Sequence, residues 1–167
     1  GQVKKVSRIR ILYSFIFILM GFYLCTGLFD RKVHGLIESY LPPPIEEHWI
    51  DNIDDALEES NMHDKPIFID FTGYTCTNCR WMEINIFEDN EVKKIFENFI
   101  LTKLYTDGKE ELHKKNRRLE IDRFGTAALP FYVVLSKDDK LISTFPGMDT
   151  NKENFINFLK KSLINNE

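Results

Sequence analysis

The chain has 167 residues, of which 43% are hydrophobic and 13% aromatic, and its formal net charge is -4. This length fits one domain of ordinary size plus an additional segment, and the apolar content is ample for a hydrophobic core, which excludes a disordered protein. The small net charge gives no reason to expect nucleic acid as a partner. Three cysteines are too few for a secreted scaffold held together by disulfides.

The first predicted element is an apolar helix near the N-terminus. The run from Ile11 to Phe29 contains no charged side chain. At about 1.5 Å per helical residue, it nearly spans a hydrocarbon core of roughly 30 Å. It ends in TGLFDRK, which fits the cleavage pattern of a signal peptide poorly. We therefore expect a retained transmembrane helix over about 11–29, with a cleaved signal or a buried core helix as alternatives.

The flanking charges predict how this helix is oriented. The cations that follow the run, Arg31 and Lys32, lie beside Asp30. The larger group precedes it and consists of Lys4, Lys5, Arg8 and Arg10. The positive-inside rule then places the N-terminal end of 1–29 in the cytoplasm and everything after Phe29 in the opposite compartment.

Residues 30–48 are expected to form a juxtamembrane linker. The stretch VHGLIESYL, 33–41, has apolar residues at helical spacing and is suited to the membrane surface. Pro42–Pro44 cannot continue a helix and should form a short, stiff polyproline spacer. The linker leads to a folded domain over 49–167.

Helical and strand patterns alternate in this domain. Short apolar runs predict strands over 66–71, 99–107, 130–136 and 140–145. Amphipathic or charged segments predict helices over 52–64, 79–87, 90–99, 109–125 and around Phe155–Leu163. Asp89 or Asn90 is a plausible cap of the third helix, and Gly125 is expected to end the fourth. Strands separated by helices, closing with a hairpin and a helix, describe an α/β sandwich with a mixed sheet.

Two of the three cysteines, Cys76 and Cys79, lie in the stretch IDFTGYTCTNCRWME, where a predicted strand gives way to a helix. At a helix N-terminus, unpaired backbone N–H groups and the helix dipole favour a thiolate, which is the reactive form of cysteine. One turn further on, Cys79 is close enough to close a disulfide with Cys76. This arrangement indicates a redox-active pair.

Zinc binding and a purely structural disulfide are the competing hypotheses for the pair. A zinc site usually needs four ligands, yet Cys25 falls in the predicted membrane helix and the histidines do not cluster in the sequence. A structural disulfide that closes so short a loop would contribute little stability. We expect no metal site, and we expect the histidines at the surface: His34, His48, His63 and His113.

These residues resemble a known family. The strand followed by C-x-x-C, and Leu129-Pro130 before a later strand, are similar to thioredoxin-like domains. More narrowly, FTGYTCTNCRWME after a membrane helix resembles the C-terminal part of DsbD-type thiol:disulfide interchange proteins. The resemblance covers nearly the whole chain, as a last transmembrane segment and a periplasmic thioredoxin-like domain. The chain departs from the pattern at Thr75, where many thioredoxin-like proteins have tryptophan, and in the charged stretch 109–123. The relay cysteines of the family's membrane domain have no match here.

The resemblance implies roles for individual residues. Cys76 would be the nucleophile and Cys79 the resolving thiol. Pro130 would match the family's cis-proline, which packs beside the disulfide and offers backbone hydrogen bonds to an extended partner. The residues expected to contact such a partner are Tyr74, Thr75, Leu129 and Pro130.

Two carboxylates, Asp70 and Glu83, match acidic residues near the family's active site. Asp70 interrupts an apolar strand, where a carboxylate is costly unless it has a function or a partner. The alternative for Asp70 is a solvated strand end, and the alternative for Glu83 is an ordinary exposed helix residue.

The expected function is that of a membrane-anchored thiol:disulfide oxidoreductase in the bacterial inner membrane. The resemblance implies a reductase that passes electrons from a membrane domain to oxidised periplasmic proteins, without a cofactor beyond its cysteine pair. An anchored thioredoxin-like protein for cytochrome c maturation is the alternative within the enzyme class. From another class, a non-catalytic carrier could use the two cysteines as metal ligands.

Overall fold

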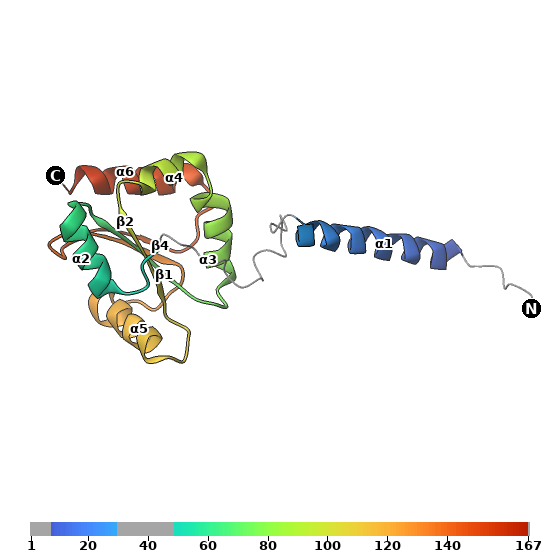
Figure 1. The fold of residues 1–167 in the computed structure, drawn as a ribbon, viewed down its shortest axis with the longest axis horizontal. Coiled ribbons are helices and arrows are strands. Elements are labelled where there is room, and N and C mark those ends of the chain that lie inside the picture. The colour runs from blue at the N-terminus through green and yellow to red at the C-terminus, as the bar shows by residue number, and fades with distance from the viewer. Residues whose placement is uncertain (1–7, 30–48, 167) are drawn as a thin grey trace, which may run out of the picture. The chain divides into compact units, whose positions relative to one another are not determined.

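The computed structural model describes residues 8–29 and 49–166, with side chains described for 9–22 and 49–166. The first of its two compact units contains helix α1 (Arg8–Phe29), blue in Figure 1. Within the part of the chain that the structure describes, no helix has both the length and the apolarity needed to cross a membrane. The predicted linker 30–48, with its proline spacer, lies outside the described residues.

The second unit is built on a four-stranded sheet in the order β2-β1-β3-β4. Its strands are β1 (Ile67–Thr72), β2 (Ile100–Tyr105), β3 (Phe131–Leu135) and β4 (Leu141–Pro146). Strand β1 pairs parallel with β2 and antiparallel with β3, and β3 pairs antiparallel with β4. The predicted mixed sheet is therefore confirmed, as is the hairpin between the last two strands.

Helices cover both faces of this sheet (Figure 1). One face carries α2 (Ile53–His63) and α5 (Glu111–Phe124). The other carries α3 (Thr77–Met82), the π-helical turn η2 (Glu83–Phe87), α4 (Asn90–Phe96) and α6 (Lys152–Ile164). The helix expected over 79–87 thus starts earlier and changes its hydrogen-bonding period at Glu83, and π-helical turns of this kind are frequent at functional sites.

The alternation of side chains along β1 divides the core in two. Phe68 points to the face of α3, α4 and α6, where it packs with Tyr132, Phe155 and other aromatic rings. Ile67 and Ile69 point to the opposite face, beneath α2 and α5. Because successive strand residues face opposite sides, Asp70 shares the face of Phe68, and this register fixes the position of its carboxylate.

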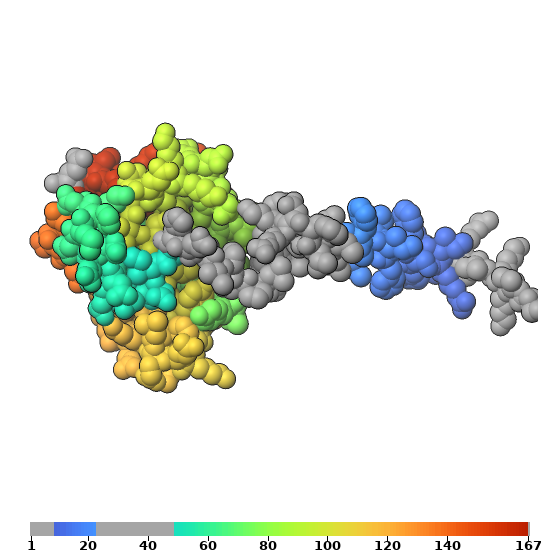
Figure 2. All heavy atoms as spheres, in the orientation of Figure 1, coloured from blue at the N-terminus to red at the C-terminus, as the bar shows by residue number. Residues whose placement is uncertain are grey.

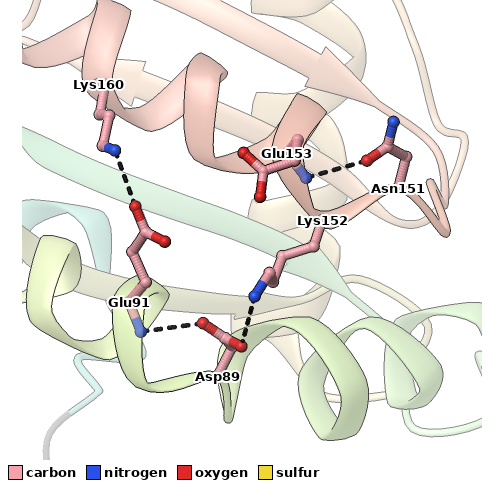
Figure 3. A network of polar contacts seen from close by, with 6 residues as sticks. All are labelled: Asp89, Glu91, Asn151, Lys152, Glu153 and Lys160. Atoms are coloured by element: carbon pink, nitrogen blue, oxygen red, sulfur yellow. Dashed lines mark hydrogen bonds and ion pairs between the residues drawn. The ribbon is translucent and has the colours of Figure 1, made fainter.

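Polar contacts tie α4 to α6 (Figure 3). Asp89 caps α4 by accepting a hydrogen bond from the Glu91 N–H at 2.9 Å, as one of the two predicted caps. Its carboxylate also pairs with Lys152 at 2.9 Å, and Lys160 pairs with Glu91 at 2.8 Å. The Lys152 hydrogen bond is the main cause that lowers the pKa of Asp89. These contacts join α4 to α6 on the sheet face that also carries α3.

Glu120 is fully buried on α5, which the charged sequence 109–125 did not indicate. Burial raises the pKa of its carboxyl group from 4.5 to about 7, and Arg117 lowers it by less. Between these two pH values the folded state keeps a proton that the unfolded state has released. The free energy of unfolding should therefore fall as the pH rises through this interval.

Replacing Glu120 with glutamine should remove this pH dependence, because an amide does not titrate. We expect Glu120→Gln to gain about 2 to 3 kcal/mol of unfolding free energy relative to wild type between roughly pH 5 and pH 8. Urea unfolding at several pH values measures the difference. Glu58→Gln, at an exposed position of α2, is the control and should show no such trend. A difference between Glu120→Gln and wild type that is constant with pH would contradict the prediction.

Candidate active site

Cys76 and Cys79 lie at the junction of β1 and α3, as the sequence predicts, and are joined by a disulfide with an S–S distance of 2.03 Å. Cys76 is the N-cap residue of α3, and its Sγ accepts a hydrogen bond from the Cys79 N–H at 3.2 Å. A sulfur in this position faces the unpaired N–H groups of a helical segment that α3 and η2 continue to Phe87. These groups favour the thiolate of Cys76 once the disulfide is reduced.

The two sulfurs differ in their access to solvent. Cys76 is half-buried, whereas Cys79 is only 1% exposed. A partner can therefore reach Cys76, while Cys79 is placed to react with the Cys76 sulfur rather than with solvent. This asymmetry suits a two-step exchange in which one thiol attacks and the other resolves.

Asp70 lies in the middle of β1 and is 0% exposed, so it is not a solvated strand end. Its register partners are Lys103 on β2 and Tyr132 on β3, both buried. Burial raises the pKa of Tyr132 well above its ordinary value, and the negative charges of Asp70 and Glu83 raise it further. Asp70, Lys103 and Tyr132 thus form a set of buried polar side chains on the sheet face that α3 covers.

Glu83 is also buried, which corrects the alternative of an exposed helix residue. Its carboxylate forms ion pairs with Arg80, one turn earlier, and with Lys103 at 3.4 Å between Nζ and Oε1. All three side chains are nearly inaccessible to solvent. Lys103 also lies over the ring of Trp49, 4.6 Å from its centroid. Arg80 and Glu83 on the cysteine helix and its continuation therefore face the sheet, where Lys103 and Asp70 are register partners.

The loop before β3 contributes the predicted partner-contacting residues Leu129 and Pro130. The peptide bond between them is cis. The Pro130 carbonyl accepts a hydrogen bond from the Gly147 N–H at 2.9 Å. Leu129 is half-buried and packs against the segment before the cysteines, since a Cβ added to Gly73 would lie 3.2 Å from its Cδ1. Phe131 belongs to the core.

Tyr74, 48% exposed, lies beside the cysteines and stacks on Tyr105 with a centroid distance of 4.1 Å. Its hydroxyl is 3.3 Å from Nε2 of His113 on α5. In Figure 2 the segment after β1 (green) reaches the surface near the yellow start of α5, in agreement with this contact. The prediction that His113 is a surface residue is wrong, because the imidazole is packed against the two tyrosine rings.

Asp107 is a residue of this site that the sequence pattern did not single out. It follows β2, and its carboxylate accepts hydrogen bonds from the backbone N–H groups of Tyr74 and Thr75 at 2.9 and 3.1 Å. The Thr75 hydroxyl donates a third, at 3.0 Å. Burial raises the pKa of Asp107, but these hydrogen bonds outweigh it and the pKa lies below its ordinary value. A signal was available, because the ends of parallel neighbouring strands meet at one edge of the sheet.

The chemistry of this site rests on the cysteine pair. Among residues with described side chains, no group of three or more His, Cys, Asp or Glu could hold a metal ion. A dithiol at a helix start, with one accessible and one buried sulfur, can exchange two electrons with another disulfide. The buried carboxylates lie on the sheet face that this helix covers.

Comparisons with known proteins agree with the geometry. Two DsbD thiol:disulfide interchange proteins, from two strains of Campylobacter jejuni, are 27% identical over 132 residues, which is 79% of this chain and 23% of each relative. The chain thus spans about a quarter of the length of these relatives. The fold is similar to a thioredoxin from Thermus thermophilus, with 16% identity, a TM-score of 0.59 and coverage of 71% of this chain and 88% of that one. It is also similar to the oxidised C-terminal domain of Neisseria meningitidis DsbD, with 17% identity, a TM-score of 0.55 and coverage of 68% and 98%.

The matches confirm the resemblance seen in the sequence. Residues 48–137, more than half of the chain, match the family model described as thioredoxin-like. The chain therefore belongs to the thioredoxin-like family, and its Cys76–Cys79 pair makes it a thiol:disulfide oxidoreductase of that family.

Proposed function

We propose that the chain is the terminal reductase part of a membrane-anchored thiol:disulfide interchange protein, which passes electrons to oxidised proteins in the periplasm. The observation that carries this proposal is the disulfide between a half-buried Cys76 and a buried Cys79 at the start of α3. The similarity to proteins named for thiol:disulfide interchange supports it, because the matched part of this chain contains the cysteine pair. The match covers about a quarter of the length of those proteins, which is consistent with one part of a longer protein.

The proposed reaction is a pair of exchanges. The Cys76 thiolate attacks one sulfur of the partner's disulfide, so that a mixed disulfide forms and the partner's other sulfur leaves as a thiolate. Cys79 then loses its proton and attacks the Cys76 sulfur, which releases the partner's second sulfur as a thiolate. Two electrons pass to the partner, its two thiolates take up two protons, and the Cys76–Cys79 disulfide is restored. A dithiol of the membrane domain would reduce that disulfide again.

Asp70 and Glu83 are proposed to assist the proton transfers of this cycle. Both carboxylates are buried on the side of the sheet that the cysteine helix covers. A buried carboxylate near a thiol disfavours the thiolate by charge repulsion and can accept its proton.

The partner is proposed to bind over Tyr74, Thr75, Leu129 and Pro130. Tyr74 and Thr75 are exposed beside Cys76. Leu129 packs next to Gly73, three residues before Cys76. An extended backbone from an oxidised protein would pair with the loop at Pro130 while its disulfide reaches Cys76.

The anchor in the inner membrane is proposed from the uncharged sequence 11–29, and the periplasmic position of 49–167 from the excess of cations before it. We expect a cysteine introduced at Asn165, in a Cys76→Ser/Cys79→Ser/Cys25→Ala background, to react with an impermeant maleimide on intact cells. Protection of position 165 until lysis would contradict the orientation.

The reductase direction is tested by the redox state of the pair in cells. Acid quenching of cells with the unsubstituted chain, followed by alkylation, should find Cys76 and Cys79 mainly as thiols when the complete membrane relay is present. A permanently oxidised pair would contradict the reductase direction.

A further inference from the structure

The residues just before Cys76 are held by a segment distant in sequence. We define the active-site turn as Gly73, Tyr74 and Thr75, which connects β1 to the Cys76 cap. Both carboxylate oxygens of Asp107 are used on this turn, with Oδ1 on the Tyr74 N–H and Oδ2 on the Thr75 N–H and hydroxyl. The backbone N–H groups of Tyr74 and Thr75 thus donate to Asp107 in the β2–α5 connection and not to acceptors within the turn.

The packing around Asp107 leaves little freedom. A Cβ added to Gly73 would lie 2.8 Å from Asp107 Oδ2, so the glycine lets the carboxylate approach the backbone. On the preceding residue of the connection, the Thr106 N–H donates to the Thr72 carbonyl at 3.0 Å. Tyr74 is fixed on the same side through its stacking on Tyr105. The turn and the connection are therefore joined by hydrogen bonds and by the stacked tyrosine rings.

Thr75 adds a side-chain contact between the active-site turn and Asp107. A hydroxyl at this position can donate to Asp107, and it does so at 3.0 Å. Hydrogen bonds to a charged acceptor are stronger than neutral ones. Thr75 is followed directly by Cys76, whose own N–H donates to the Gly73 carbonyl at 3.2 Å. Thr75 is therefore coupled through the backbone to Cys76, the N-cap residue of α3.

We infer that Asp107 is a positioning residue for Cys76, which fixes the active-site turn so that the nucleophilic sulfur lies at the helix N-terminus. Its role is distinct from those of Asp70 and Glu83, because it acts on the turn from the exposed side of the site, whereas they are buried under the helix. The inference rests on the proposed thiol–disulfide exchange.

The test is the pH dependence of iodoacetamide alkylation of Cys76 in the reduced full chain, with Cys25→Ala in every variant. Asp107→Ala should raise the pH midpoint of alkylation and slow the reaction at neutral pH by about tenfold or more. The reason is that the Cys76 sulfur would no longer be held at the N-terminus of α3, where backbone N–H groups favour the thiolate. Asp107→Asn keeps one acceptor oxygen for the turn and should fall between wild type and Asp107→Ala. Thr75→Val, which loses only the hydroxyl bond, should shift the midpoint in the same direction by less.

Asp122→Asn is the control, at an exposed position of α5, and should match wild type. A lower midpoint and faster alkylation in both Asp107 variants would overturn the inference, because Asp107 would then act through its charge. A midpoint equal to wild type in Asp107→Ala would also overturn it. If that variant does not fold, Thr75→Val decides alone by the same criterion. Failure of wild-type Cys76 to react as a thiolate would instead contradict the proposed function.

Discussion

Replacing Glu83 with alanine is expected to destabilise the thioredoxin-like domain by about 3 to 5 kcal/mol, because it leaves two buried cations without their carboxylate. Arg80 and Lys103 both form ion pairs with Glu83, and the three side chains are almost completely buried. The penalty arises from the loss of a carboxylate that two buried cations share and is not the net worth of the ion pairs. Since domains of this size unfold at a cost of roughly 5 to 15 kcal/mol, the loss should be plain in urea unfolding.

An ion pair at the surface serves as the control that separates the effect of burial from the effect of charge pairing. Glu111 pairs with Lys114 at 2.6 Å, but both side chains are more than half exposed. Glu111→Ala should therefore cost less than about 1 kcal/mol. Glu83→Gln, which keeps the shape of the side chain and loses its charge, should fall between the two. A loss below about 1 kcal/mol in Glu83→Ala would show that water or rearrangement satisfies the cations, against the expectation for a buried pair.

Much of the fold could be predicted from the sequence, because it depends on local patterns. The apolar run after Pro66 gives β1, and Gly125 ends α5 in a left-handed conformation with φ of 71°. Cys76 could be placed at a helix start for the same reason, since the strand run stops and a helical pattern follows. The apolar strand around Asp70 left two positions open, a functional buried carboxylate or a solvated strand end, and the structure shows burial.

The pairing of side chains across the fold could not be predicted in this way. Lys103 on β2 pairs with Glu83, which is far from it in the sequence, so no helical or strand periodicity relates the two residues. His113 looked like a surface residue because α5 is highly charged, yet the tyrosines beside the cysteines cover it. Asp107 lies in a polar loop, where an aspartate is common, and only the closeness of the β1 and β2 ends reveals its contact with the active-site turn.

The division of labour between the two cysteines gives the second large effect. Without Cys79, the mixed disulfide on Cys76 has no internal thiol to resolve it, so Cys79→Ser should accumulate covalent complexes with oxidised partners. Without Cys76, the remaining sulfur is 1% exposed in the wild-type structure and a partner disulfide cannot reach it. Cys76→Ser should therefore lose exchange activity without forming complexes.

The most direct measurement of the central claim is the covalent complex itself, in cells that express each variant with Cys25→Ala and are quenched with acid. Non-reducing gels should show higher-mass bands for Cys79→Ser that disappear on reduction, and none for Cys76→Ser. Equal bands in both variants, or bands for Cys76→Ser alone, would contradict the assignment of nucleophile and resolving thiol. Bands in neither variant, with metal bound stoichiometrically by the wild type, would contradict the oxidoreductase itself and favour a carrier.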